Sequence, residues 1–143
     1  MKPRISCDTL TVHTMPGSHA IRCEGNTVYF RVRGCIDESD IQTIIDLGDR
    51  LGAQYGQFWI LLYAQEMTTI TTEARRLAVN SPNLRNLGGG AIIGASLANR
   101  TILTLINRAM NLLGGAHVRS TFVQTEAEAK DWLAAQQPTP PFS

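Results

Sequence analysis

The 143-residue sequence predicts an α/β fold, as a single domain with a mixed, mainly parallel sheet of about five strands and about four helices. Strand-like segments alternate with single helix-like segments from Ala20 onward, which favours parallel pairing through right-handed crossovers. The segment Phe58–Leu62 is apolar on both faces, as expected for a central strand. The chain length and the 43% content of hydrophobic residues suit one globular core.

The first third of the chain predicts a hairpin and a helix. Two strand-like segments, Ala20–Cys23 and Thr27–Arg33, are joined by a glycine-containing turn, and the second alternates apolar and polar residues. Leu10–Thr14 is a further short extended piece. The following helix can be capped by Asp37 or Ser39, since Ser39 with Gln42 fits a capping box, and Gly52 can end it.

After the central strand, a threonine-rich turn leads into a second helix, which begins near Thr72 and stops before Ser81-Pro82. The glycines at positions 88–90 lead into a strand over Ala91–Ala95. Ser96 then caps a long helix over Leu97–Leu113, which ends at the glycine pair that follows.

The last elements are a strand over His117–Val123 and a helix opened by a capping box of Thr125 and Glu128. We expect residues 1–18 to be an N-terminal extension, residues 19–136 to form the domain and residues 137–143 to be a flexible tail. Cys7, Cys23 and Cys35 lack close pairing, so they predict neither a disulfide framework nor a zinc site. The N-terminus lacks the apolar core of a signal peptide, and we expect a cytoplasmic protein.

Three blocks carry a resemblance to a known family. They are Ile60–Leu62 followed by Ile70–Leu77, then Ala91–Arg100, then the ending Thr125–Leu133. In their order and spacing they resemble the SpoIIAA-like, or STAS/SEC14-type, family of small bacterial domains, over most of the chain from about Ala20. The resemblance implies this family's fold, and it implies a regulatory or signalling role through protein–protein interaction.

The resemblance also implies a switch at the start of the second helix. In the anti-sigma-factor-antagonist branch the corresponding turn carries Asp-Ser-Ser-Gly-Leu-Gly, whose phosphorylated serine controls partner binding. Thr71 and Thr72 match the Asp-Ser part, Glu73 stands at the phosphorylated serine, and both glycines are missing. A phosphate on Thr72 would still meet the positive end of the helix dipole.

Two other interpretations of this turn stay open. In the first, the negative charge of Glu73 either mimics a permanently modified state or marks a lost switch. In the second, Thr71 and Thr72 only cap the helix, and Glu73 favours its first turn. The predicted partner-binding turn extends to the adjacent Arg75 and Arg76.

The charged residues separate along the chain. No Asp or Glu occurs between Ala74 and Thr125, while that interval holds six arginines, and acids concentrate in the predicted first helix. One interpretation is a docking surface for an acidic protein, an anionic ligand or a membrane. The other is a set of solvated arginines that pair with the acidic first helix. We do not expect nucleic acid as a partner, because aromatic residues are few.

The helix over Leu97–Leu113 is apolar around half its circumference or more, beyond the stripe of about 100° that one sheet contact needs. Surplus apolar surface implies deeper burial or a second contact, of which a homodimer is the simplest. Residues predicted for the partner surface are Arg100, Leu103, Asn107 and Met110. Docking on a membrane is a weaker option, because the helix holds two arginines and no lysine.

No catalytic constellation emerges. Gly94–Ala98 sits like a nucleophile elbow, but its second glycine is alanine, and Ser96 is more simply a helix cap. The glycines at 88–90 precede their strand, which disfavours a nucleotide site, and the histidines lack metal-ligand spacing. The sequence therefore predicts a non-enzymatic regulatory or protein-interaction domain without metal or cofactor. The alternative is a SEC14-like carrier of a lipid or another small apolar ligand, with the long helix lining its cavity.

Overall fold

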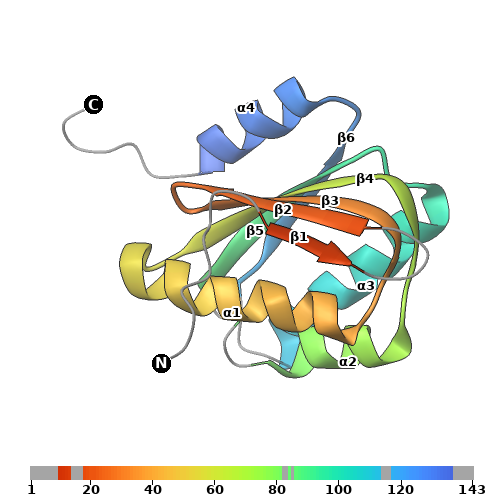
Figure 1. The fold of residues 1–143 in the computed structure, drawn as a ribbon. Coiled ribbons are helices and arrows are strands. Elements are labelled where there is room, and N and C mark those ends of the chain that lie inside the picture. The colour runs from red at the N-terminus through yellow and green to blue at the C-terminus, as the bar shows by residue number, and fades with distance from the viewer. Residues whose placement is uncertain (1–9, 14–17, 82–83, 85, 114–116, 137–143) are drawn as a thin grey trace.

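The computed structural model describes residues 10–13, 18–81, 84, 86–113 and 117–136. In this part of the chain, one mixed sheet is covered by helices on both faces (Figure 1). The strands are β1 (Leu10–His13), β2 (Ser18–Glu24), β3 (Thr27–Ile36), β4 (Phe58–Ile70), β5 (Leu87–Ile93) and β6 (Arg119–Val123). The helices are α1 (Glu38–Tyr55), α2 (Thr72–Asn80), α3 (Leu97–Leu113) and α4 (Glu126–Gln136). The predicted α/β fold class is confirmed.

The six strands lie in the sheet in chain order. β1, β2 and β3 pair antiparallel, whereas β3, β4, β5 and β6 pair parallel. α1, α2 and α3 each carry the chain one strand further in the same direction. A constant crossover handedness therefore places all three on one face of the sheet, and α4 covers the other face (Figure 1).

The core has two parts, one on each side of the sheet. Phe58 and Leu62 of β4 belong to the larger part, under α1, α2 and α3. Trp59 and Leu61, the intervening residues, belong to the smaller part, with Leu133 of α4. Successive residues of a strand point to opposite faces, so β4 is buried on both, as the sequence predicted for a central strand.

Of the two caps predicted for the first helix the structure selects one, and it corrects the predicted C-terminal end. Asp37, not Ser39, is the N-cap of α1, and its capping box pairs it with Asp40. The helix also continues past Gly52 to Gly56, whose φ of 83° suits a glycine. Gly52 lies against the side chain of Asn86, where a Cβ has no room, so packing explains that glycine.

β4 and β5 differ most from the strands that the sequence predicted. β4 does not stop at Leu62 but runs through the threonine-rich segment to Ile70, because the end of β3 pairs with it and Met67 and Ile70 are buried. β5 begins at Leu87, so the glycine run lies inside the strand. A Cβ on Gly89 would collide with the carbonyl oxygen of Arg119, so this glycine permits the close approach of β5 and β6.

β3 runs past the predicted Arg33 to Ile36, and the remaining boundaries agree more closely with the predictions. α2 and α3 begin and end as predicted, within the described residues. Thr125 accepts a hydrogen bond from the backbone N–H of Glu128 (3.2 Å) at the start of α4. The extended piece at Leu10 forms β1 and pairs with β2, inside the predicted N-terminal extension. Cys7 and the predicted tail lie outside the described residues.

Candidate functional site

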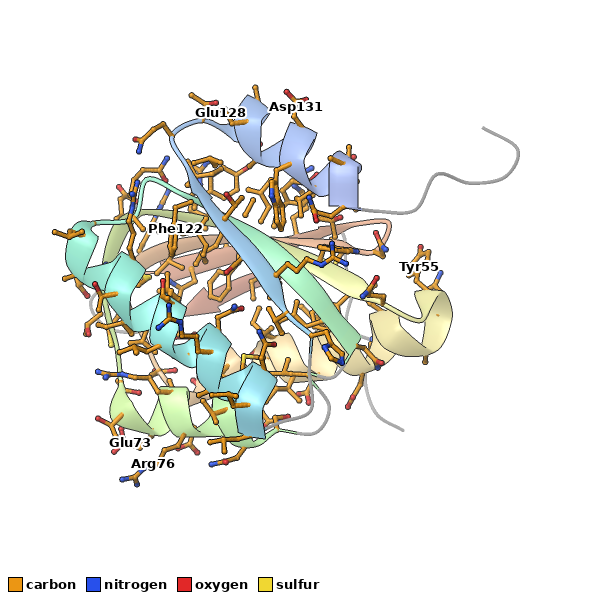
Figure 2. All side chains as sticks on the ribbon, turned by 180° about the vertical axis from the view of Figure 1, so that it is seen from behind. Tyr55, Glu73, Arg76, Phe122, Glu128 and Asp131 are labelled. Carbon is orange, nitrogen blue, oxygen red and sulfur yellow. The ribbon has the colours of Figure 1, made fainter. Side chains whose placement is uncertain are left out.

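The start of α2 is an exposed turn with one structural threonine. The Oγ1 of Thr71 accepts a hydrogen bond from the backbone N–H of Ala74 (3.1 Å), so Thr71 is the N-cap. Thr72 and Glu73 are exposed in the first helical turn. The Nε of Arg75 donates to the carbonyl oxygen of Ile70 (3.0 Å). Figure 2 shows Glu73 and Arg76 pointing away from the domain.

The structure corrects the orientation predicted for the long helix. Met110, predicted on the partner surface, is buried, and the half-buried Leu103 packs against the core. The amide of Asn107 donates to the carbonyl oxygen of Val118 (3.2 Å). The guanidinium of Arg100 lies over the ring of Phe122, 5.4 Å from its centroid. These four residues therefore line the inner side and the β6-facing flank of α3.

Three asparagines explain this orientation. Asn99 is buried, and its amide donates to the carbonyl oxygen of Met67 in β4 (3.1 Å). Asn107 and Asn111 both bond to the backbone of Val118, just before β6. Short amide side chains on one side of a helix were the signal in the sequence, because buried amides need backbone partners. The polar residues of α3 therefore face the protein in part.

The outer side of α3 carries a row of exposed apolar side chains. We define the leucine face as Leu97, Thr101, Leu105, Arg108 and Leu112, which lie on one side of a helix of 3.6 residues per turn. Leu97, Leu105 and Leu112 are 82%, 59% and 83% exposed, and the adjacent Leu113 is 78% exposed. Exposed leucines that recur along one side of a helix are typical of an interaction surface.

An apolar cavity of about 160 Å³ lies between the sheet and the helices of the larger core. Ile60, Leu62 and Ile92 line it from the sheet, and Ala78 and Leu103 line it from α2 and α3. An engineered apolar cavity of roughly 150 Å³ binds benzene, whereas drug-sized ligands need about 300 Å³ or more. This cavity therefore has room for a single ring or a short alkyl chain, but not for a two-chain lipid.

A buried histidine–carboxylate pair ties β2 to α1. His19 and Asp40 are both fully buried, with 3.2 Å between Nε2 and Oδ2. The backbone N–H of Arg33 donates to Nδ1 of His19 (2.9 Å), which places the ring proton on Nε2, facing Asp40 and the carbonyl oxygen of Cys35 (2.9 Å). No local pattern in the sequence points to this pair, because the two residues lie on different elements.

The burial of Asp40 raises the pKa of its carboxyl group, although hydrogen bonding from the backbone of Asp37 opposes the shift. Its Oδ2 accepts that hydrogen bond (2.9 Å), while Oδ1 has no partner in the described part of the chain. The pair is enclosed within the fold, so we assign it a structural role.

Among the described residues, Arg75, Arg76, Arg100 and Arg108 make no ion pair with the acidic helix. The ion pairs seen between described residues include Arg22 with Glu24, Arg33 with Glu66, Lys130 with Glu126 and His19 with Asp40. Within these residues Arg76, Arg100 and Arg108 have no carboxylate within 4.0 Å. The interpretation in which the arginines pair with the acidic first helix therefore does not hold for these three residues.

The features considered for catalysis have local structural roles. The Oγ of Ser96 accepts from the backbone N–H of Asn99 (3.2 Å), as an N-cap does. The described segments contain no group of three or more His, Cys, Asp or Glu side chains placed to hold a metal ion. Among the helices described, none has the length and apolar character needed to cross a bilayer.

Comparison with known proteins agrees with the fold. The sequence model of the SpoIIAA-like family matches residues 27–134. Comparison with curated proteins gave no match. Similar solved structures include the anti-sigma factor antagonist SpoIIAA in its unphosphorylated form, with 16% identity, TM-score 0.54, and 81% of this chain and 97% of that chain covered. A protein of the DUF3478 family from Shewanella loihica PV-4, with a SpoIIAA-like fold, is similar at 15% identity and TM-score 0.54, covering 93% of this chain and 98% of that chain.

The phosphorylated form of SpoIIAA from Bacillus is similar at 15% identity and TM-score 0.50, covering 80% of this chain and 98% of that chain. At these identities the structural likeness shows the fold alone. The family match is independent of it and extends from the start of β3 into α4, over more than half of the chain. This chain therefore belongs to the SpoIIAA-like family.

Proposed function

We propose that this protein is a non-enzymatic regulatory domain that binds a protein partner through the leucine face of α3. The observation that carries the proposal is the exposure of Leu97, Leu105 and Leu112 along one side of a helix whose opposite side packs against the core. Fully burying a leucine contributes about 1.5–3 kcal/mol relative to leaving it exposed. Three such side chains supply enough apolar surface for a partner helix laid along α3.

The exposed start of α2 is the second part of the proposed surface. Thr71 already holds the helix cap, so Thr72 is the hydroxyl of this turn that a kinase can reach. A phosphate there would meet free backbone N–H groups, but it would also stand beside Glu73. SpoIIAA, a structural neighbour of this chain, exists in phosphorylated and unphosphorylated forms. Intact mass after incubation with cell extract and ATP, compared with Thr72→Ala, tests the modification.

Site-specific photocrosslinking tests the leucine face. A photoreactive benzophenone amino acid replaces Leu105 in one variant and Tyr55 in another, within cells that make the protein. Tyr55 is a matched control, because it is 48% exposed at the far end of α1, away from α3 (Figure 2). We expect a discrete crosslinked protein at position 105 that is lost with Leu112→Glu. Equal or absent crosslinking at both positions would contradict the proposal. A product at twice the mass of the chain would identify a homodimer.

The apolar cavity favours a second candidate function, the carrier of a small apolar ligand. The cavity lies under α3, where the carrier interpretation expects it, and its volume limits the ligand to about the size of a single ring or short chain. Native mass spectrometry of protein purified from cells tests this function. We expect a bound ligand to be lost in Ala78→Leu, which fills the cavity, and kept in Ala134→Leu, on the exposed side of α4. An unliganded protein would leave partner binding as the sole candidate.

A further inference from the structure

We infer that the partner presents an acidic amphipathic helix to the leucine face. This inference rests on the proposed function and adds the chemistry of the partner. The leucine face runs from Leu97 to Leu112, about 22 Å at a rise of 1.5 Å per residue, and it is a single row of side chains wide. A long, narrow apolar row matches one apolar stripe of another helix better than it matches a flat surface.

Cations accompany this row. Arg108 lies within the leucine face and is exposed, and Arg100 lies on the flank toward β6. The sequence has no Asp or Glu between Ala74 and Thr125, so α3 offers these arginines no carboxylate. No other carboxylate of the described chain lies within 4.0 Å of either guanidinium. A partner with carboxylates beside its apolar stripe would pair both arginines.

A second copy of this chain fits the surface less well. Two α3 helices packed together would leave each Arg108 against a helix without acids. The exposed acids of α1 include Asp46 and Asp49, but Leu47 between them is buried. On α4, Glu128 and Asp131 point outward (Figure 2), and the exposed apolar residues near them are alanines. No described face of this chain is both acidic and rich in large apolar side chains.

The leucines and the arginines have separable contributions. Burial of the leucines supplies affinity for any amphipathic helix, while exposed ion pairs add a modest preference that salt screens. We expect each arginine to favour an acidic over a basic helix by roughly two- to five-fold. Together the two arginines should give a ratio of about ten at low salt.

Two synthetic peptides of the same length provide the probes. Both carry leucines at positions i, i+4, i+7 and i+11 with alanines between them, and their flanking positions hold glutamate in one peptide and lysine in the other. Fluorescence anisotropy measures their binding to the full chain at low and high salt. We expect the glutamate peptide to bind about ten-fold tighter at low salt, with the ratio falling as salt rises.

Variants of the protein test whether Arg100 and Arg108 cause the preference for the glutamate peptide. The double variant R100E/R108E should bind the lysine peptide more tightly than the glutamate peptide. The control Lys130→Glu makes a charge change of the same sign on α4, across the sheet, and should leave the preference unchanged. Leu105→Glu should weaken binding of both peptides. Circular dichroism spectra of the variants confirm that each one folds.

Several outcomes would overturn the inference. If both peptides bind equally well and both lose binding to Leu105→Glu, the acidic partner is refuted. The leucine face would then still be an interface. A preference that survives R100E/R108E refutes the role of these arginines. If neither peptide binds, the acidic-helix partner is rejected, and crosslinking at position 105 decides separately on the proposed function. If the wild type sediments as a dimer and Leu105→Glu sediments as a monomer, a second copy of this chain binds the leucine face.

Discussion

At the residue scale, two adjacent threonines at the start of α2 have different environments. Thr71 adopts the extended backbone conformation of an N-cap, and its side chain satisfies the N–H of Ala74. Thr72 is exposed, and its side chain makes no hydrogen bond within the described residues. Thr71 therefore contributes to the stability of α2, whereas a modification of this turn would fall on Thr72.

We expect Thr71→Ala to lower the free energy of unfolding by about 1 kcal/mol, because α2 loses its cap. Thr72→Ala should change it by less than about 0.5 kcal/mol, as at other exposed sites without partners. Urea denaturation of both variants measures the difference. Similar losses in the two variants would show that the cap does not govern the stability of this turn.

The carboxyl group of Asp40 is a second residue with a measurable consequence. It is buried beside His19, and the desolvation of the carboxyl group outweighs the lowering effects of the Asp37 backbone hydrogen bond and of His19. Burial raises the pKa of Asp40 above its ordinary value of 3.8. An acid with a raised pKa binds its proton more tightly in the folded state than in the unfolded state.

The stabilisation from protonated Asp40 is therefore full below pH 3.8 and is lost as pH rises through the raised pKa of the folded state. Asp40→Asn removes this titration and keeps the side-chain shape. We expect the stability of the wild type relative to Asp40→Asn to fall as pH rises from about 4 to 7. Urea denaturation across that range measures the difference. A constant difference would mean that Asp40 has the same pKa in the folded and unfolded states.

At the scale of the element, α3 has two apolar sides with opposite consequences for mutation. Met110 is 6% exposed and lines the cavity, whereas Leu105 is 59% exposed on the leucine face. A carboxylate at position 110 would be buried without a partner, while one at position 105 would remain in water. Substitution by glutamate should therefore destabilise the fold at position 110 and leave the fold stable at position 105.

We expect Met110→Glu to cost more than about 4 kcal/mol of stability, and Leu105→Glu to cost less than about 0.5 kcal/mol. Thermal unfolding followed by circular dichroism distinguishes the two. Leu112→Glu is the matched control, because Leu112 is 83% exposed on the same leucine face. A large loss of stability in Leu105→Glu would show that this side chain packs within the protein.

The sequence predicted the boundaries of α3 and its serine cap, since these depend on local signals such as Ser96. The direction in which the helix faces was not predictable in the same way. An apolar surface of half a circumference fits the sheet in more than one rotation, and the hydrogen bonds of Asn99, Asn107 and Asn111 to β4 and β6 select one. Likewise, Thr68 and Thr69 have the composition of a turn, but pairing with Cys35 and its neighbours holds them in β4.

At the scale of the whole molecule, the alternation of strands and helices was enough to predict the fold class. Each helix between parallel strands moves the chain by one strand, so the order of the sheet follows the order of the sequence. The carrier interpretation placed a cavity along the long helix, but the size of the cavity was not predictable in this way. Its walls come from strands and helices far apart in sequence, and its volume depends on how closely those walls approach.

The cavity should make the protein sensitive to pressure, because unfolding eliminates internal void volume. We expect a negative volume change of unfolding, within the usual range of about −20 to −100 mL/mol. Ala78→Leu places three further carbons at the cavity wall and should reduce the magnitude of this change by roughly 20 mL/mol. The fluorescence of Trp59, which is 2% exposed, follows unfolding under pressure.

Ala134→Leu is the control for added side-chain volume, because Ala134 is exposed on α4 and lies outside the cavity. It should leave the volume change of unfolding as in the wild type. A filled cavity should also raise the unfolding temperature of Ala78→Leu, since new contacts replace empty space. If Ala78→Leu instead lowers the unfolding temperature and leaves the volume change unaltered, the space beside α2 is not available to a side chain. A small apolar ligand would then be excluded from it for the same reason.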